Sequence, residues 1–338
     1  MTEVGVHPAL IMMKIKPMKK RFAISGFLLP LLTVIVGCVA IPESTADETT
    51  GLTFIHLNDT YRVGAVEDGK RGGFGRVVTV VRELQAQGRE VRILHGGDFL
   101  YPSLESQIWN GMQMVDAMNY LDDLAPMYVT LGNHELDRRT PEHVINAVAA
   151  SRFDWISDNV RFRTGDPDVD AALQSAFIFD AAGKRFGVFS VTLHAEDGGN
   201  ARDYAPTDGN YLAVARRAIE TLESTGVDVI IGLTHVHLWT DVEMARLKAE
   251  YPKLAFIVGG HEHEPQFVAG SPAQAPVMKG ASNARVIWNI DVSFDGEGLP
   301  VVDADVMEMG VGIEPDPDYA ELDRKWRGQL LEKFPFLD

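Results

Sequence analysis

The sequence predicts an α/β fold built around a largely parallel sheet. Five short runs rich in Val, Ile, Leu and Phe have the length and composition of buried parallel strands. They are Thr53–Leu57, Val91–Leu94, Tyr128–Leu131, Val227–Leu233 and Leu254–Val258. Segments with helical spacing of apolar residues lie between these runs, and alternation of strand and helix is typical of βαβ units. The predicted helices are Val77–Gln87, Gln107–Leu121, Pro141–Ala150, Tyr211–Glu223 and Asp241–Glu250.

The pattern changes toward the end of the chain. Arg285–Ser293 and Pro300–Met307 both have the composition of strands, and no helical segment separates them. Two consecutive strands joined by a short loop predict an antiparallel addition to the sheet. A turn-prone Glu-Pro-Asp-Pro-Asp segment then leads into a charged terminal helix, predicted over Pro315–Phe334.

The first 37 residues resemble a bacterial secretory signal. A cluster of five basic residues precedes the apolar stretch Phe22–Val36, which is too short for a comfortable membrane span. Cys38, the only cysteine, follows a glycine at the end of this stretch, as in the lipobox of bacterial lipoproteins. We therefore predict a lipoprotein signal peptide over 1–37, a lipid on Cys38 and a flexible tether over 38–51. An uncleaved anchor with a buried cysteine is the alternative.

Length, charge and cysteine content limit what the exported part can be. The chain has 338 residues, enough for one large α/β domain, which we place at 52–312, followed by a linker-like helix at 313–338. With a single cysteine, the domain contains no internal disulfide. Loss of residues 1–37 removes five basic residues and one acidic residue, so the net charge changes from −17 to −21. A net charge of −21 argues against a nucleic-acid partner, because both carry negative charge, but not against a small anionic substrate held by metal ions.

Polar residues that bind metals follow each of the five predicted strands. They are Asp59, Asp98, Asn133, His235 and the pair His261 and His263. Ligands of open α/β sheets gather beyond the carboxyl ends of the strands, so these side chains should meet at one rim. Any one of them alone is more often a helix cap or a packed histidine. Together they predict a site for two metal ions.

The residue types suggest how the two ions would be shared. Asp98 follows two glycines that let the backbone turn tightly, and its carboxylate could bridge both ions. Asp59 and His263 would hold the first ion, whereas Asn133, His235 and His261 would hold the second. Oxygen and imidazole ligands suit divalent Zn, Mn, Fe or Co, and the ligand types do not choose among these metals.

The order and spacing of these blocks resemble the calcineurin-like metallophosphoesterase superfamily. The matching blocks are Asp59, Gly97-Asp98, Gly132-Asn133-His134-Glu135, Thr234-His235 and Gly260-His261-Glu262-His263. Further segments, among them Leu57-Asn58-Asp59 and Gly72-Gly73-Phe74-Gly75-Arg76, are similar to the catalytic domain of bacterial 5′-nucleotidases. The resemblance implies a four-layer αββα sandwich with a dimetal site at the strand ends. It also implies that His134 assists catalysis without binding metal, that Asp137 orients its imidazole, and that Glu135 is structural.

Two tyrosines are additional candidate ligands. Tyr61 stands where the family usually has histidine, and a phenol binds a metal well only when a strongly acidic ion deprotonates it. Tyr101, in Gly97-Asp98-Phe99-Leu100-Tyr101, resembles the tyrosine block of purple acid phosphatases, with packing as its alternative role.

The function implied by the resemblance is hydrolysis of nucleotides or similar phosphate esters by metal-activated water. The enzyme would be an exported bacterial lipoprotein, anchored through Cys38 and facing the periplasm or the cell exterior. A catalytically impaired binding lipoprotein of the same fold is the alternative, prompted by Tyr61. A nuclease is a third hypothesis, and the net charge of −21 opposes it.

Overall fold

The computed structural model describes residues 48–193, 201 and 203–337. The chain divides into two units, Met1–Thr45 and Ala46–Asp338, and both sheets with their helices belong to the second unit. The predicted signal peptide, Cys38 and most of the predicted tether therefore lie outside the described residues. Among the helices that are described, none combines the length and the apolar character needed to cross a bilayer.

The first sheet has the strand order β12-β11-β1-β2-β3-β4. Its strands are β1 (Glu48–Leu57), β2 (Glu90–His95), β3 (Met127–Thr130), β4 (Asp154–Ile156), β11 (Val286–Phe294) and β12 (Pro300–Glu308). Strands β1 to β4 run parallel, whereas β11 pairs antiparallel with both β1 and β12. The predicted antiparallel addition is therefore confirmed.

The second sheet has the strand order β5-β6-β7-β8-β10-β9. Its strands are β5 (Phe177–Ala181), β6 (Lys184–Thr192), β7 (Val229–His235), β8 (Leu254–Gly259), β9 (Gln266–Val268) and β10 (Val277–Lys279). The central strands β6, β7, β8 and β10 are parallel, and the two edge strands pair antiparallel. Sequence patterning found β7 and β8 but missed the other four strands of this sheet.

Most helices lie on predicted segments. The helices are α1 (Phe74–Ala86), α2 (Leu104–Trp109), α3 (Met112–Leu124), α4 (Glu142–Ala150), α5 (Pro167–Asp170), α6 (Tyr211–Ser224), α7 (Leu238–Ala245) and α8 (Tyr319–Lys333). Of these, α5 was not predicted, and α7 covers only the first half of the helix predicted over Asp241–Glu250. The single helix predicted over Gln107–Leu121 is wrong, because Asn110 and Gly111 adopt left-handed backbone (φ 52° and 80°) and separate α2 from α3. A Cβ on Gly111 would also lie 2.6 Å from the Leu100 side chain.

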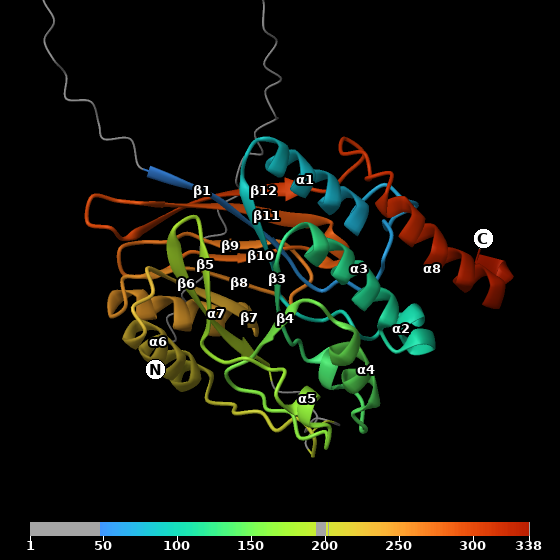
Figure 1. The fold of residues 1–338 in the computed structure, drawn as a ribbon, viewed down its shortest axis with the longest axis horizontal. Helices are drawn as coiled ribbons and strands as arrows, with labels where there is room; N and C mark the ends of the chain where they lie inside the picture. The colour runs from blue at the N-terminus through green and yellow to red at the C-terminus, as the bar shows by residue number, and fades with distance from the viewer. Residues whose placement is uncertain (1–47, 194–200, 202, 338) are drawn as a thin grey trace, which may run out of the picture. The chain divides into compact units, whose positions relative to one another are not determined.

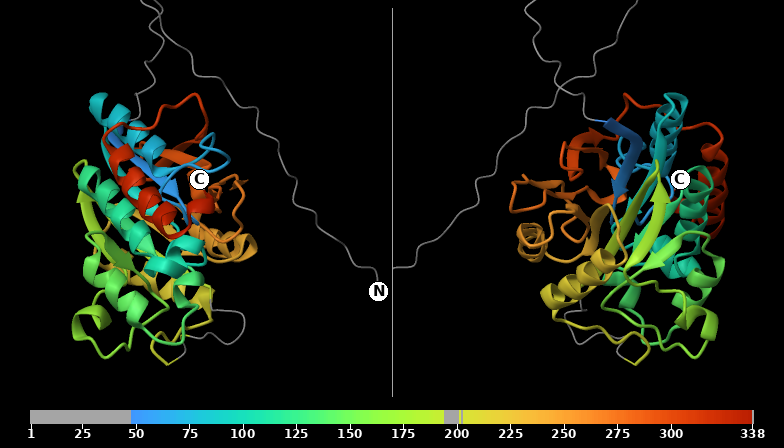
Figure 2. Two further views of the ribbon diagram at one scale, coloured as in Figure 1. Left: turned by 90° about the vertical axis from the view of Figure 1, so that its right-hand side faces the viewer. Right: turned by 60° about the vertical axis from the view of Figure 1, so that its left-hand side comes forward.

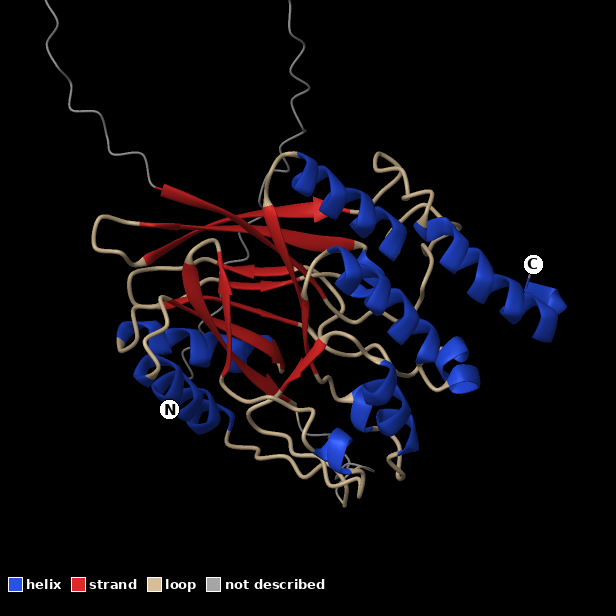
Figure 3. Ribbon diagram, in the orientation of Figure 1, coloured by secondary structure: helices blue, strands red, loops and turns tan. Residues whose placement is uncertain are grey.

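Three hydrophobic clusters define four layers. One cluster, which includes Phe54, Tyr128, Phe186, Phe256 and Trp288, fills the space between the two sheets. A second joins the outer face of the first sheet to α1, α3 and α4, and a third joins the outer face of the second sheet to α6 and α7. Figures 1 and 3 show these two helix groups on opposite sides of the strands. The predicted αββα sandwich is confirmed.

The terminal helix α8 packs on this sandwich. It lies beside α1 and α3, as the left view of Figure 2 shows. Tyr319 is buried at its first turn, where its ring stacks on Phe74 and its hydroxyl donates to the Val63 carbonyl at 3.1 Å. The guanidinium of Arg82 on α1 also lies 3.0 Å from the Asp316 carboxylate.

Candidate metal centre

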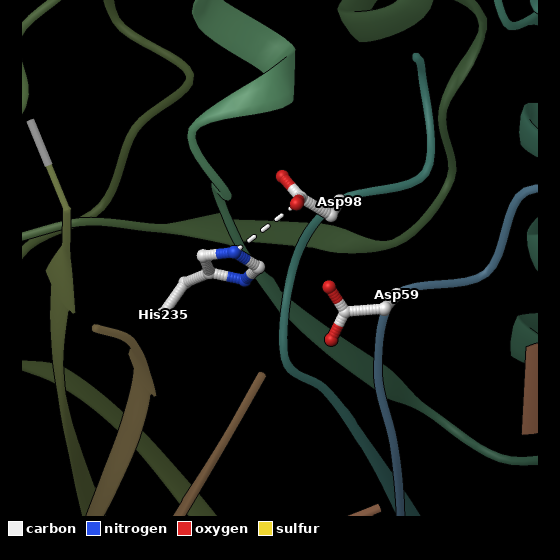
Figure 4. Close-up of side chains that lie close together, drawn as sticks. All are labelled: Asp59, Asp98 and His235. Atoms are coloured by element: carbon white, nitrogen blue, oxygen red, sulfur yellow. Dashed lines mark ion pairs between the residues drawn. The ribbon is translucent and has the colours of Figure 1, made fainter. Parts of the chain in front are cut away.

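Three buried side chains converge where strands of both sheets end. Asp59 follows β1, Asp98 follows β2, and His235 is the last residue of β7. One ligand atom from each lies within 4.8 Å of the others, and all three side chains are buried. Figure 4 shows them turned toward a common point. Two carboxylates and an imidazole arranged in this way form a donor set suited to a transition-metal ion.

The backbone around this point is held in an uncommon conformation. Asp59, Asp98, His261 and His263 all have positive φ, at 53°, 59°, 93° and 62°. Such left-handed backbone costs about 1 kcal/mol or more at a residue other than glycine. Four of the six predicted ligands share this cost, which points to a functional constraint on where their side chains must lie.

The loop that carries Asp98 packs directly on the loop that carries Asn133. Gly97 has φ 79°, and a Cβ on it would lie 2.5 Å from the Gly132 amide nitrogen. A Cβ on Gly132 would in turn lie 2.0 Å from Asp98 Oδ1. Glycine at both positions therefore lets two backbones approach closely enough to bring Asp98 beside the next strand end.

The predicted first pocket contains Asp59, His263 and Tyr61. Asp59 Oδ1 lies 3.1 Å from His263 Nε2. The Tyr61 hydroxyl is 3.1 Å from the same nitrogen and 3.3 Å from Asp98 Oδ2. Burial would raise the pKa of Asp59, but the hydrogen bond from His263 and the nearby His235 hold it well below its usual value. Burial and the carboxylates of Asp98 and Asp59 raise the pKa of Tyr61 far above its ordinary value, so the phenol is neutral without a cation.

The predicted second pocket contains Asn133, His235 and His261. His235 Nδ1 lies 2.6 Å from the Gly96 carbonyl oxygen, a contact that assigns the proton to Nδ1. Asn133 Oδ1 is 3.2 Å from His261 Nδ1. Burial, together with the neighbouring His235 and His237, lowers the pKa of His261 to about 4, which leaves its imidazole neutral and able to bind a cation.

One buried atom in this pocket is a direct test of whether a metal fits. His235 Nε2 makes no aligned hydrogen bond, yet it lies 3.2 Å from Asp98 Oδ2. With Nδ1 protonated, these are two acceptor atoms in contact, and a proton or a cation must lie between them. Burial opposes a charged imidazole, but the carboxylates of Asp98 and Asp59 raise the pKa of His235 to about 10. The residues present fit a bound cation.

His134 lies at the partly exposed rim of the cluster. Its backbone N–H donates to Asp98 Oδ1 at 2.8 Å, and its Nδ1 lies 2.7 Å from Asp137 Oδ2. Its Nε2 is 3.9 Å from Asp98 Oδ2. The hydrogen bond to Asp137 outweighs the effect of burial and raises the pKa of His134 to about 9. A protonated imidazole therefore faces the cluster at neutral pH.

Glu135 is a structural residue of the Asp98 loop in this arrangement. Its buried carboxylate accepts backbone N–H groups from Asp98, Phe99, Leu100 and Gly132 at 2.6–2.9 Å. It thereby ties two strand-end loops together beside the cluster. Burial and the nearby Asp98 raise the pKa of Glu135.

Two asparagines for which the sequence predicted no role support the Asp59 loop. Asn58 donates to Asp59 Oδ2 at 2.5 Å and accepts from the Gly280 amide at 2.8 Å. Asn283 donates its backbone N–H to the Asp59 carbonyl and accepts the Tyr61 N–H on its side chain, both at 2.9 Å. The Gly72-Gly73 motif in turn holds Asn283 in place, since the Gly73 N–H donates to the Asn283 carbonyl at 3.0 Å.

The sequence also predicted no role for Lys279, a fully buried lysine that contacts the loops after β7 and β8. Lys279 Nζ lies 2.9 Å from the Gly260 carbonyl and 2.5 Å from the Val236 carbonyl. It also contacts the carboxylates of Asp241 at 2.9 Å and Glu262 at 2.6 Å. Buried charges persist only when they are paired in this way. The available signal was a lysine inside an apolar Val-Met-Lys strand, which is unusual for a core position.

Tyr101 lies in a packed environment apart from these pockets. Its buried hydroxyl donates to Asn110 Oδ1 at 2.9 Å, and its ring contacts His143. This geometry favours the packing role over the ligand role. Other histidines that are not candidate ligands also have partners away from the pockets. The rings of His56 and His143 hydrogen-bond to backbone carbonyls, and the ring of His95 hydrogen-bonds to Thr60. His194 lies outside the described residues.

A pocket of carboxylates and imidazoles at the strand ends of an αββα sandwich defines the class of metal-dependent phosphoric ester hydrolases. The model of the calcineurin-like phosphoesterase family matches residues 52–265, and the chain belongs to that family. The predicted recognition and enzyme class are thus confirmed.

Proteins similar to this chain include apyrases and 5′-nucleotidases. It is 22% identical to an apyrase from Tabanus yao over 78% of this chain and 50% of that protein. It is 27% identical to a snake venom 5′-nucleotidase from Crotalus adamanteus, over 82% and 46% of the two chains. A probable 5′-nucleotidase from Treponema pallidum is also 27% identical, over 68% and 39%. The chain thus spans about half the length of the first two of these relatives and less of the third.

Solved structures of similar fold include a 5′-nucleotidase precursor from Thermus thermophilus. Its TM-score is 0.72 at 22% identity, covering 83% of this chain and 59% of that one. The calcineurin-like phosphoesterase YfkN from Bacillus subtilis has a TM-score of 0.65 at 14% identity, covering 83% and 98%. At these identities the two structures establish the fold alone.

Proposed function

We propose that this chain is an exported, lipid-anchored phosphoesterase that hydrolyses nucleotides or similar small phosphate esters. The observation that carries the proposal is the convergence of Asp59, Asp98 and His235 within 4.8 Å, with His134 at the rim. The 5′-nucleotidase and apyrase relatives support a nucleotide as the substrate.

The proposed ligand sets follow from the contacts. Asp59, His263 and Tyr61 would hold one cation, and Asn133, His235 and His261 would hold the other. Asp98 faces both, since its Oδ2 contacts Tyr61 and His235. Two divalent ions, Zn, Mn, Fe or Co, would neutralise the phosphate and activate water.

His134 and Asp137 are the proposed catalytic pair. Asp137 accepts a hydrogen bond from His134 Nδ1–H, and its carboxylate raises the pKa of His134 to about 9. The imidazole is therefore protonated on both nitrogens at neutral pH, and Nε2–H is the donor that faces the reacting ester. That proton would go to the leaving alkoxide oxygen as the P–O bond breaks. An alkoxide is a poor leaving group without a proton, so this transfer is required for efficient release.

Tyr61 supports one alternative, a fold-related binding lipoprotein with impaired catalysis. Its hydroxyl lies 3.1–3.4 Å from His263, Asp98 and Asp59, within the first cation position. A neutral phenol at this position would weaken the binding of the first metal ion. A nuclease has less support, because the acidic surface repels a polyanion.

Metal analysis followed by a substrate panel separates these hypotheses. We expect the purified wild-type domain to contain about two metal equivalents and to hydrolyse AMP or a UDP-sugar, with activity lost on chelation and restored by Mn or Zn. A bis-aryl phosphodiester in the panel distinguishes diesterase from monoesterase activity. Metal binding without turnover of any ester would favour the binding lipoprotein. Turnover that persists after metal removal would contradict the proposal.

Membrane attachment is a separate part of the proposal. Its support is the basic segment, the apolar stretch and Cys38 in the sequence. We expect the full-length wild-type protein to partition with membranes and a Cys38→Ala variant to lose lipid labelling. Equal labelling of both proteins with a radioactive fatty acid would rule out Cys38 as the anchor.

A further inference from the structure

The most exposed tryptophan of the described chain lies next to the candidate metal centre. Trp239, the second residue of α7, is 68% exposed. Its ring stacks on the ring of His237, with centroids 4.1 Å apart and planes 16° apart. Because the indole packs on His237 and is otherwise largely exposed, a flat π-surface remains available to a second aromatic ring.

The His237 ring links Trp239 to the candidate metal centre. The ring of His237 also meets the ring of His261 edge to face, with centroids 4.4 Å apart. His261 is a proposed ligand, so Trp239 stands two ring contacts away from the second cation position. A group attached to a phosphate held at that position could therefore reach the indole.

The position of Trp239 relative to the cluster is also fixed by polar contacts. Glu262, between the two ligand histidines, accepts the backbone N–H of Leu238 at 2.6 Å. Lys279 donates hydrogen bonds to the Glu262 carboxylate and to the carbonyl of Val236, which lies just before α7. These contacts fix the backbone at the start of α7, and the stack on His237 orients the indole before any ligand arrives. Such preorganisation lowers the ordering cost of binding.

We propose that the exposed face of Trp239 is a stacking platform for the flat aromatic part of the substrate, namely the base of a nucleotide. This inference rests on the proposed function, because it takes the phosphate to be held at the cluster. Every nucleobase has a π-face, and stacking on tryptophan tolerates any of them. The platform therefore selects base-bearing esters over esters that lack a base, and it does not select one base.

The test compares AMP with ribose 5-phosphate, which carries the same phosphate and sugar without the base. We expect wild-type kcat/KM to favour AMP by about tenfold or more, and Trp239→Ala to reduce this preference to near one. Trp239→Phe should keep most of the preference because phenylalanine retains a π-face. Phe267→Ala is the matched control, since that ring is 42% exposed on β9 and should leave the preference unchanged.

Two outcomes would overturn the platform without affecting the phosphoesterase assignment. They are a wild type that hydrolyses both esters equally well, and a Trp239→Ala variant that loses activity on both by the same factor, as a structural role would produce. If wild type hydrolyses neither of these two esters, the substrate panel decides the proposed function, and calorimetry with metal-loaded protein decides the platform. AMP must then bind more tightly than ribose 5-phosphate to wild type, but not to Trp239→Ala.

Discussion

Replacing Asp98 with asparagine is expected to abolish turnover. The carboxylate lies between both proposed cation positions, with Oδ2 3.3 Å from the Tyr61 hydroxyl and 3.2 Å from His235 Nε2. Asparagine has the same shape but removes the negative charge that would attract and bridge two ions. We expect kcat/KM to fall at least about a thousandfold, equivalent to ~4 kcal/mol. Metal content, measured by mass spectrometry, should fall below two equivalents.

A matched control separates this effect from the mere removal of one negative charge from the protein. Asp303 is an exposed carboxylate on β12, the edge strand of the first sheet, and Asp303→Asn should leave both activity and metal content unchanged. Full activity and two metals in the Asp98 variant would contradict the bridging role.

Replacing His134 with alanine is expected to lower turnover about a hundredfold to a thousandfold with metal content unchanged. The imidazole contacts Asp137 through Nδ1, while the backbone amide of the same residue contacts Asp98, so the side chain is the group that faces the reacting ester. Steady-state kinetics together with metal analysis measures both quantities. Loss of metal from this variant would instead make His134 a ligand.

The same role has a pH signature. The proton is present on His134 below its raised pKa of about 9, so proton donation is lost as the pH rises through that value. Asp137→Asn removes the carboxylate that raises this pKa, and the alkaline limb of the rate profile should move to lower pH. A wild-type limb that the Asp137 variant does not move would assign the titration to another group.

The candidate site was largely predictable because of one geometric rule. Parallel strands end at the same edge of a sheet, so the residues after β1, β2 and β3 form one group of neighbours and those after β7 and β8 form another. The packing of the two sheets against each other brings the two groups together. The rule does not give the conformations that bring them together. The left-handed backbone of His261 and His263, and the Glu135 contacts that shape the Asp98 loop, depend on packing between loops distant in sequence.

The supporting residues were less predictable, because nothing local distinguishes them. Lys279 lies in a three-residue strand, and its partners Asp241 and Glu262 are 38 and 17 positions away by residue number. The exposed Trp239 carries no sequence signal of its position either, since the His261 ring that links it to the cluster comes from another loop.

The sequence alone determined the alternation of strands and helices, the antiparallel strands β11 and β12, and the identity of the groups at the strand ends. These follow from apolar periodicity and from which side chains interrupt it, and both are properties of neighbouring residues. The tertiary structure alone decided which strands share a sheet, how Tyr61 enters the first pocket, and that a buried ammonium fixes α7 beside the histidines. Those features depend on contacts between segments far apart in the chain, where the free energy of packing and buried charge, not local propensity, selects the arrangement.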